Sequence, residues 1–153
     1  MVRAMAPVLR LALVLACSAA AAPGAPGDRV AIPMMKTSIY VGTVTLVTSP
    51  FARSGDEYTA TYEARVRPWF FWSETGRITI KVPPADLARL RAGETVEFTG
   101  DAENHKKKPR HVRGRAQPAG AGGTTGRIKV RIGVDDTELI FNGTYELGDA
   151  PRD

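Results

Sequence analysis

The chain has 153 residues and a formal net charge of +5, with 43% apolar and 24% charged side chains. This length suits one domain, and the composition is that of a globular protein, which excludes a fibrous or largely disordered chain. Six Lys or Arg and no acid lie between Asn104 and Arg115, so +5 less these 6 leaves −1 for the rest of the chain. The sequence therefore indicates a nearly neutral body with one concentrated positive segment.

Residues 1–21 carry the pattern of a secretory signal peptide. Arg3 and Arg10 accompany an apolar run from Val8 to Ala16 that is too short to span a bilayer, and small residues follow it. We therefore expect export to the periplasm or the cell surface of a bacterium. The chain has no apolar run of about eighteen residues or more, so we expect no membrane-spanning helix.

Cys17, the only cysteine, lies where the apolar run ends. The segment Val14-Leu15-Ala16-Cys17 resembles the lipobox of bacterial lipoproteins, in which the cysteine becomes the lipidated first residue of the mature chain. The alternative is cleavage after Ala20 or Ala21, which discards the cysteine with the peptide. The first outcome predicts an outer-membrane lipoprotein tethered through Cys17, and the second predicts a free exported domain. Either way the domain has no disulfide.

The rest of the chain is expected to divide into three parts. An Ala/Pro/Gly-rich stretch at 22–36 is typical of a flexible tether, 37–148 forms one domain, and 149–153 is a tail. Turn signals recur about every ten residues in the domain, which predicts an all-β fold, a small antiparallel barrel or sandwich of about 7–9 strands. One short helix at about 84–92 is expected as a cap, because prolines begin it and Gly93 ends it.

Alternating polar and apolar residues define the expected strands, most clearly at 57–67. The expected strands are 38–48, with a bend or bulge at Gly42, and then 57–67, 77–82, 95–99, 111–116, 126–134, 137–141 and 144–147. Residues 51–55 are predicted to form a turn, and Asn142-Gly143 is predicted to form a two-residue hairpin turn. The strands at 95–99 and 111–116 predict a hairpin whose connecting residues, 104–110, are too polar to be buried.

The basic hairpin has three interpretations. Lysines at a solvated tip keep a sheet edge from pairing with other chains. In the second interpretation the cations grip phosphates of lipid headgroups or of anionic envelope polymers. The hypothesised contacts are Lys106, Lys107, Lys108 and Arg110 at the tip and Arg113 and Arg115 on one face of the returning strand. Nucleic acid, which basic hairpins on small barrels bind, is not expected as a partner, because the export signal separates the chain from it.

Four of the eleven aromatic residues are consecutive, at Trp69-Phe70-Phe71-Trp72. In a strand, Trp69 and Phe71 would point to one face and Phe70 and Trp72 to the other. One explanation is core packing with a lid over one end of the barrel. The other is an exposed rim for an apolar ligand, or an anchor in a membrane interface. We place Trp69 and Trp72 among the hypothesised ligand-binding residues.

No catalytic or cofactor-binding motif accompanies these segments. The two histidines, His105 and His111, flank the lysines, and their spacing from Asp101 and Glu103 matches no closed metal site. The neighbouring lysines would also repel a metal cation. We therefore expect no enzyme activity, no cofactor and no metal.

Together these features predict a non-enzymatic, exported envelope protein that binds an amphiphilic or anionic ligand through its aromatic and basic segments. The alternative is a structural or accessory protein that docks on a protein partner through the same aromatics. An enzyme of unrecognised type ranks third. The sequence makes no prediction of the oligomeric state.

Overall fold

The computed structural model describes residues 27–148. The predicted signal peptide with Cys17, and the tail at 149–153, lie outside the described residues. Within residues 27–148 no helix is long and apolar enough to cross a membrane.

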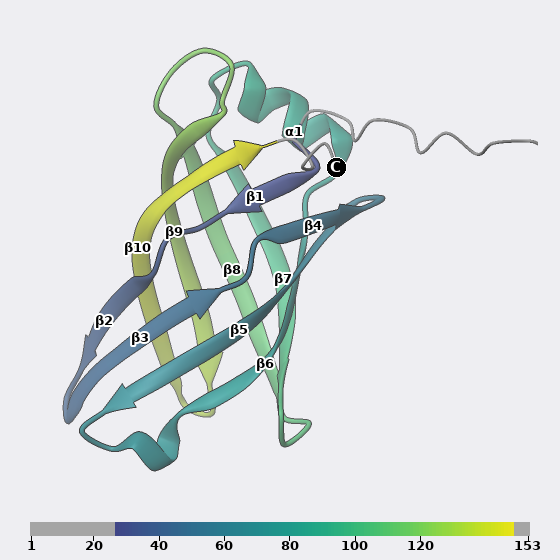
Figure 1. The fold of residues 1–153 in the computed structure, drawn as a ribbon. Coiled ribbons are helices and arrows are strands. Elements are labelled where there is room, and N and C mark those ends of the chain that lie inside the picture. Colours follow the sequence, from purple (N-terminus) through teal and green to yellow (C-terminus); the bar gives the residue numbers. More distant parts are fainter. Residues whose placement is uncertain (1–26, 149–153) are drawn as a thin grey trace, which may run out of the picture.

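The described chain is an antiparallel β-barrel (Figure 1). Its strands are β1 (Arg29–Ala31), β2 (Met35–Ile39), β3 (Gly42–Thr48), β4 (Phe51–Ser54), β5 (Glu57–Arg67), β6 (Glu74–Lys81), β7 (Val96–Asn104), β8 (Pro109–Pro118), β9 (Thr125–Val134) and β10 (Thr137–Gly148). They are ordered β2-β3-β5-β4-β1-β10-β9-β8-β7-β6, and a further pairing of β5 with β6 closes a barrel of eight strands to which β2 and β3 are added. The all-β prediction is confirmed, and of the two architectures left open the barrel is the one observed.

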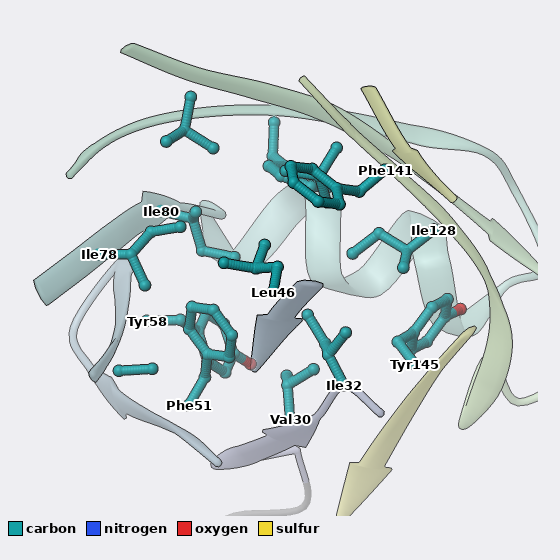
Figure 2. Close-up of a cluster of buried hydrophobic side chains, with 14 of the residues drawn as sticks. Val30, Ile32, Leu46, Phe51, Tyr58, Ile78, Ile80, Ile128, Phe141 and Tyr145 are labelled. Carbon is teal, nitrogen blue, oxygen red and sulfur yellow. The ribbon is translucent and has the colours of Figure 1, made fainter. Parts of the chain in front are cut away.

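Inward-facing side chains of the strands form one core inside the barrel. Along β5 the alternation is regular: Tyr58 and Tyr62 are buried, whereas Glu57 and Thr61 are exposed. Figure 2 shows side chains from strands on different sides of the barrel pointing toward one another. The largest fully buried side chains are Phe51, Tyr58, Phe141 and Tyr145. Each such burial contributes about 1.5–3 kcal/mol, so this alternation is the main determinant of the fold.

The helix α1 (Pro84–Arg91) closes one end of the barrel, as its predicted role as a cap requires. Leu87 and Leu90 point into the core and are buried. The helix ends before Gly93, whose φ of 89° lies in the left-handed region that favours glycine. The backbone N–H of Gly122, in the β8–β9 loop, donates to the carbonyl of Arg91 at 3.0 Å and ties that loop to the helix.

The fold begins earlier than the predicted boundary at residue 37. β1 pairs with both β4 and β10, and Val30, Ile32 and Met35 belong to the buried core. The predicted tether at 22–36 is therefore wrong from residue 27 onward. Strands of three and five residues, separated by Pro33, contain too few alternations to be distinguished from a linker by sequence pattern.

The predicted strand at 38–48 is a hairpin, in which β2 and β3 are joined by a turn at residues 40–41. Gly42 follows the turn at a close crossing of two backbones, where a Cβ atom would lie 2.0 Å from the carbonyl oxygen of Arg67. Glycine is thus required there for close approach and does not mark a bulge. The turn predicted at 51–55 is also wrong, because β4 occupies most of it and pairs with β1 and β5.

No turn occurs at Asn142-Gly143, because β10 continues through both residues. Gly143 pairs with Ile128 of β9, and a Cβ atom at this position would lie 2.8 Å from the sulfur of Met35. The glycine leaves room for a core methionine, a packing role that a dipeptide turn signal does not distinguish from a turn.

Candidate functional site

Four connections between strands lie at the same end of the barrel, opposite α1. This is the lower end in Figure 1. They are the β2–β3 turn at 40–41, the β5–β6 connection at 68–73, the β7–β8 turn at 105–108 and the β9–β10 turn at 135–136. Successive antiparallel strands alternate in direction, so every second connection returns to the same end. We call this end the mouth, and it contains both the aromatic segment and the basic tip.

A cavity of about 540 Å³ opens at the mouth and is lined from all four connections. Strands β2, β3, β5 and β10 contribute its apolar wall, formed by Ile39, Val44, Val66 and Leu139. Strands β6, β7 and β8, the β7–β8 turn and the β9–β10 turn contribute polar groups, namely Glu74, Asn104, Lys106, Lys108, Arg110 and Asp135. This volume lies within the range of ligand pockets, about 300–1,000 Å³. The cavity is therefore amphiphilic, apolar on one part of its wall and charged on another.

The aromatic segment is not a strand but a single turn of 3₁₀ helix, η1 (Phe70–Trp72). The division of alternate rings between two faces, which a strand would produce, therefore does not occur. All four rings are exposed, from 41% for Trp69 to 77% for Phe70, so core packing does not explain them. The rings pack on one another, with centroid distances of 5.5–5.9 Å.

The four aromatics have two different surroundings. Phe71 and Trp72 line the cavity, together with Tyr40 of the β2–β3 turn. Trp69 and Phe70 lie outside that lining. The indole N–H of Trp69 donates to the carbonyl of Val41 at 3.1 Å and thereby holds η1 against the β2–β3 turn. Of the two hypothesised ligand-binding tryptophans, only Trp72 is at the cavity.

The six hypothesised basic residues do not form one continuous surface. Lys106, Lys108 and Arg110 line the cavity. The ammonium group of Lys107 instead pairs with Glu103 at 3.0 Å on the exposed surface. The other two lie on the outer wall of the barrel: Arg113 pairs with Glu138 at 2.7 Å, and Arg115 is exposed on the same strand, β8.

The expectation that residues 104–110 cannot be buried is wrong at both ends of the segment. Asn104 and Arg110 are only 4% and 6% exposed, because both occupy inward positions of β7 and β8. Buried charge requires a partner, and the guanidinium of Arg110 donates to Glu74 at 3.1 Å and to Asp135 at 3.3 Å. Arg110 is therefore already paired inside the protein.

Glu74, at the start of β6, accepts the hydrogen bonds of this buried network. Besides Arg110, it accepts from the hydroxyl of Tyr62 at 2.9 Å and from the side-chain amide of Asn104 at 2.8 Å. Burial alone would raise the pKa of Glu74, but these hydrogen bonds outweigh it and hold that pKa below its ordinary value. The hydrogen bond to Glu74 raises the pKa of Arg110, and burial raises the pKa of Tyr62. The network thus holds a charged pair at neutral pH.

Sequence analysis missed Glu74, although a signal for it was present. In the strand predicted at 77–82, Ile78 and Ile80 are the inward positions. Extending that alternation backward through Gly76 places residue 74 inside the barrel. A buried acid at an inward position then requires a buried cation on a neighbouring strand.

Asn104 also shapes the β7–β8 turn. Its side-chain oxygen accepts from the backbone N–H groups of Lys106 and Lys108, both at 2.9 Å, and its carbonyl accepts from Lys107 at 2.9 Å. Lys107 has a φ of 61°, the left-handed conformation at the bend. Since no carboxylate pairs with Lys106 or Lys108 within residues 27–148, these two are the cations that the cavity offers to a ligand.

Neither histidine side chain bonds to the buried network, although His105 lines the cavity. The ring of His111 is 3.1 Å from Asp101 on the exposed outer surface, and His105 accepts from the backbone N–H of Thr75 at 3.5 Å. In the part of the chain that the structure describes, no group of three His, Cys, Asp or Glu is arranged to hold a metal ion.

No protein-family model, curated protein or solved structure matches this chain. The function proposed below therefore rests on the mouth itself.

Proposed function

We propose that the chain is a non-enzymatic binding protein whose mouth takes an anionic amphiphile. The apolar part of the ligand lies against the wall formed by β2, β3, β5 and β10, and its acidic head lies beside Lys106 and Lys108. The observation that carries this proposal is the lining of the 540 Å³ cavity, which combines an apolar wall with two lysines that have no carboxylate partner among the described residues.

The two parts of the cavity would contribute differently to binding. A ligand that buries roughly six methylene groups gains about 5 kcal/mol from the hydrophobic effect. An exposed ion pair adds only about 0.2–1 kcal/mol. The apolar wall therefore supplies most of the affinity, and the lysines select ligands with an acidic head. Arg110 contributes less than its charge suggests, because Glu74 and Asp135 already pair with it.

We propose the bacterial periplasm or cell surface as the place of action, on the signal-peptide pattern of residues 1–21. The expected ligand is then an envelope component that carries a carboxylate or phosphate on an apolar chain. If Cys17 is lipidated, the same domain acts at a membrane. If it is discarded, the domain acts in solution.

Fluorescence titration with cis-parinaric acid, a single-chain carboxylate, tests the proposal. We expect saturable binding that weakens about tenfold in the double variant Lys106→Gln/Lys108→Gln, which removes both free cations. Lys107→Gln is the matched control, because Lys107 lies on the same turn but outside the cavity lining. Absence of saturable binding, or equal weakening in the control, would refute the proposal.

Docking on a protein partner is the second candidate function. It is supported by Trp69 and Phe70, which are exposed but do not line the cavity. Ionic strength separates the two candidates. Binding of an anion through the lysines weakens from low to physiological salt, whereas an apolar docking surface responds little.

A further inference from the structure

Exposed apolar side chains are concentrated at the mouth. Seven large apolar residues are exposed among the described residues, and six of them lie on the β2–β3 turn and the β5–β6 connection. We call these six the mouth patch: Tyr40, Val41, Trp69, Phe70, Phe71 and Trp72. The seventh, Met34, precedes β2 and lies away from the mouth. Single exposed apolar residues need no explanation, but a cluster of this kind marks an interaction surface.

Cations flank the mouth patch. Lys106, Lys107 and Lys108 occupy the β7–β8 turn at the same end of the barrel, and two of them share the cavity lining with Phe71 and Trp72. Arg67, the last residue of β5, is exposed and is separated from the aromatic segment by Pro68 alone. Aromatic rings beside basic side chains are the composition that suits the interface of an anionic bilayer, where Trp and Tyr prefer the headgroup level and Lys attracts acidic lipids.

We propose that the mouth docks on the surface of an anionic lipid bilayer. The mouth patch enters the interface, and the lysines of the β7–β8 turn contact acidic headgroups. This docking does not depend on whether the cavity holds a ligand, so it goes beyond the function proposed above. If both hold, the cavity opens directly onto the bilayer, and an amphiphile passes between membrane and barrel without crossing water.

Charge favours a bilayer over a protein or a second copy of this chain. The acids near the mouth are largely paired: Glu74 and Asp135 contact Arg110, and Glu103 contacts Lys107. Asp136, in the β9–β10 turn, is the neighbouring acid for which no ion pair is found among the described residues. An interface between two copies would bring the free lysines of one mouth toward those of the other, which like-charge repulsion disfavours. An acidic lipid surface offers a partner to every cation at once.

The tryptophans allow a direct test, because the chain has only Trp69 and Trp72 and both belong to the mouth patch. The probe is vesicles of phosphatidylcholine with about one third phosphatidylglycerol, brominated in the acyl chains near the headgroups. We expect the tryptophan emission to shift to shorter wavelength and to be quenched by these vesicles. Quenching should be much weaker with phosphatidylcholine alone.

Three outcomes of that test would overturn the proposal. The first is tryptophan emission that the anionic vesicles leave unchanged. This outcome counts against the proposal even if the chain sediments with the vesicles, because another segment would then make the contact. The second is equal quenching by neutral and anionic vesicles. The third is a dimer, detected by sedimentation without lipid, that the variant Phe70→Glu abolishes.

Variants outside the cavity separate docking from ligand binding. Phe70→Glu should weaken vesicle binding about tenfold, and Lys107→Gln should weaken it about fivefold. Both should leave the titration with cis-parinaric acid unchanged, because neither residue lines the cavity. Met34→Glu is the matched control, because it introduces the same charge at an exposed apolar residue away from the mouth. This variant should bind vesicles as well as the unaltered chain does.

The two proposals can therefore fail separately. Full vesicle binding by Phe70→Glu, or an equal loss in Met34→Glu, would overturn docking and leave ligand binding intact. Quenching by vesicles without saturable binding of cis-parinaric acid would overturn the ligand proposal and support docking.

Discussion

At the scale of single residues, the pair Glu74–Arg110 governs the polarity of the cavity. Neither side chain is more than 16% exposed, so each charge depends on the other for compensation. The net contribution of such a pair to stability is small, because desolvation offsets the attraction, but removing one partner leaves an uncompensated buried charge. The pair therefore matters most when it is broken.

Glu74→Gln should lower the free energy of unfolding by about 3 kcal/mol or more, because it leaves the guanidinium of Arg110 without its main buried partner. Urea denaturation at neutral pH measures this. Glu103→Gln is the control, because it breaks an exposed pair with Lys107 and should change stability by about 0.5 kcal/mol at most. Equal effects of the two changes would show that the buried network does not hold in solution.

The same glutamate predicts a dependence on pH. Its pKa in the folded state is held below the ordinary value of about 4.3. The unfolded state therefore takes up the proton first as the pH falls. The stability that Glu74 contributes is fully present above about pH 4.3 and is lost as the pH falls through the folded-state pKa.

Acidification should accordingly narrow the difference in stability between the unaltered chain and Glu74→Gln, since protonated Glu74 resembles glutamine. Urea denaturation in steps from about pH 6 to pH 3 measures that difference. A difference that stays constant over this range would contradict the lowered pKa.

At the scale of elements, the β7–β8 hairpin has a rigid base and a solvated tip. Asn104 at the base makes hydrogen bonds within the turn and to Glu74, whereas the three lysines at the tip are exposed. Buried hydrogen-bonding groups that lose their partners cost about 1–3 kcal/mol, and exposed charges cost much less. The base and the tip should thus respond differently to substitution.

Asn104→Ala should lower the free energy of unfolding by about 2–3 kcal/mol and should weaken binding of cis-parinaric acid, because the turn that carries Lys106 and Lys108 loses its anchor. Reversal of Lys106, Lys107 and Lys108 to Glu should weaken binding of cis-parinaric acid more than the neutral double variant does, while changing stability by about 1 kcal/mol at most. Unfolding of the triple variant would show that the tip packs against the barrel.

The strand parity of β7 is testable at Phe98, which is buried and pairs with Gly114 of β8. The ring fills the space above the glycine, since a Cβ atom at residue 114 would lie 2.3 Å from the ring. Phe98→Ala should therefore cost about 3–5 kcal/mol in thermal or urea unfolding. Unchanged stability would mean that this strand does not face the core.

At the scale of the whole molecule, the sequence correctly predicts strands in which polar and apolar residues alternate. It fails where a prediction depends on one or two residues alone. The strand at 57–67 is confirmed to the residue, and the helix is confirmed at Pro84–Arg91. The turn at Asn142-Gly143 is wrong, because dipeptide preference cannot reveal that Met35, more than a hundred residues away, occupies the space beside the glycine.

The mouth was predictable in part. Antiparallel strands alternate in direction. Two strands separate the connections at 68–73 and 105–108, so both connections lie at the same end of the barrel. Closure of the barrel and the pairing of Glu74 with Arg110 depend on contacts between strands distant in sequence. A single sequence carries no direct record of such contacts.

The most direct measurement of where a ligand binds is the change in amide chemical shifts, recorded by nuclear magnetic resonance, when dodecyl phosphate is added to the isotope-labelled protein. We expect the largest changes at the mouth, at residues such as Val44, Val66, Lys108 and Leu139, and none around α1 at the closed end. Changes centred on α1 or on the outer wall at Arg113, or no saturable changes at all, would contradict binding at the mouth.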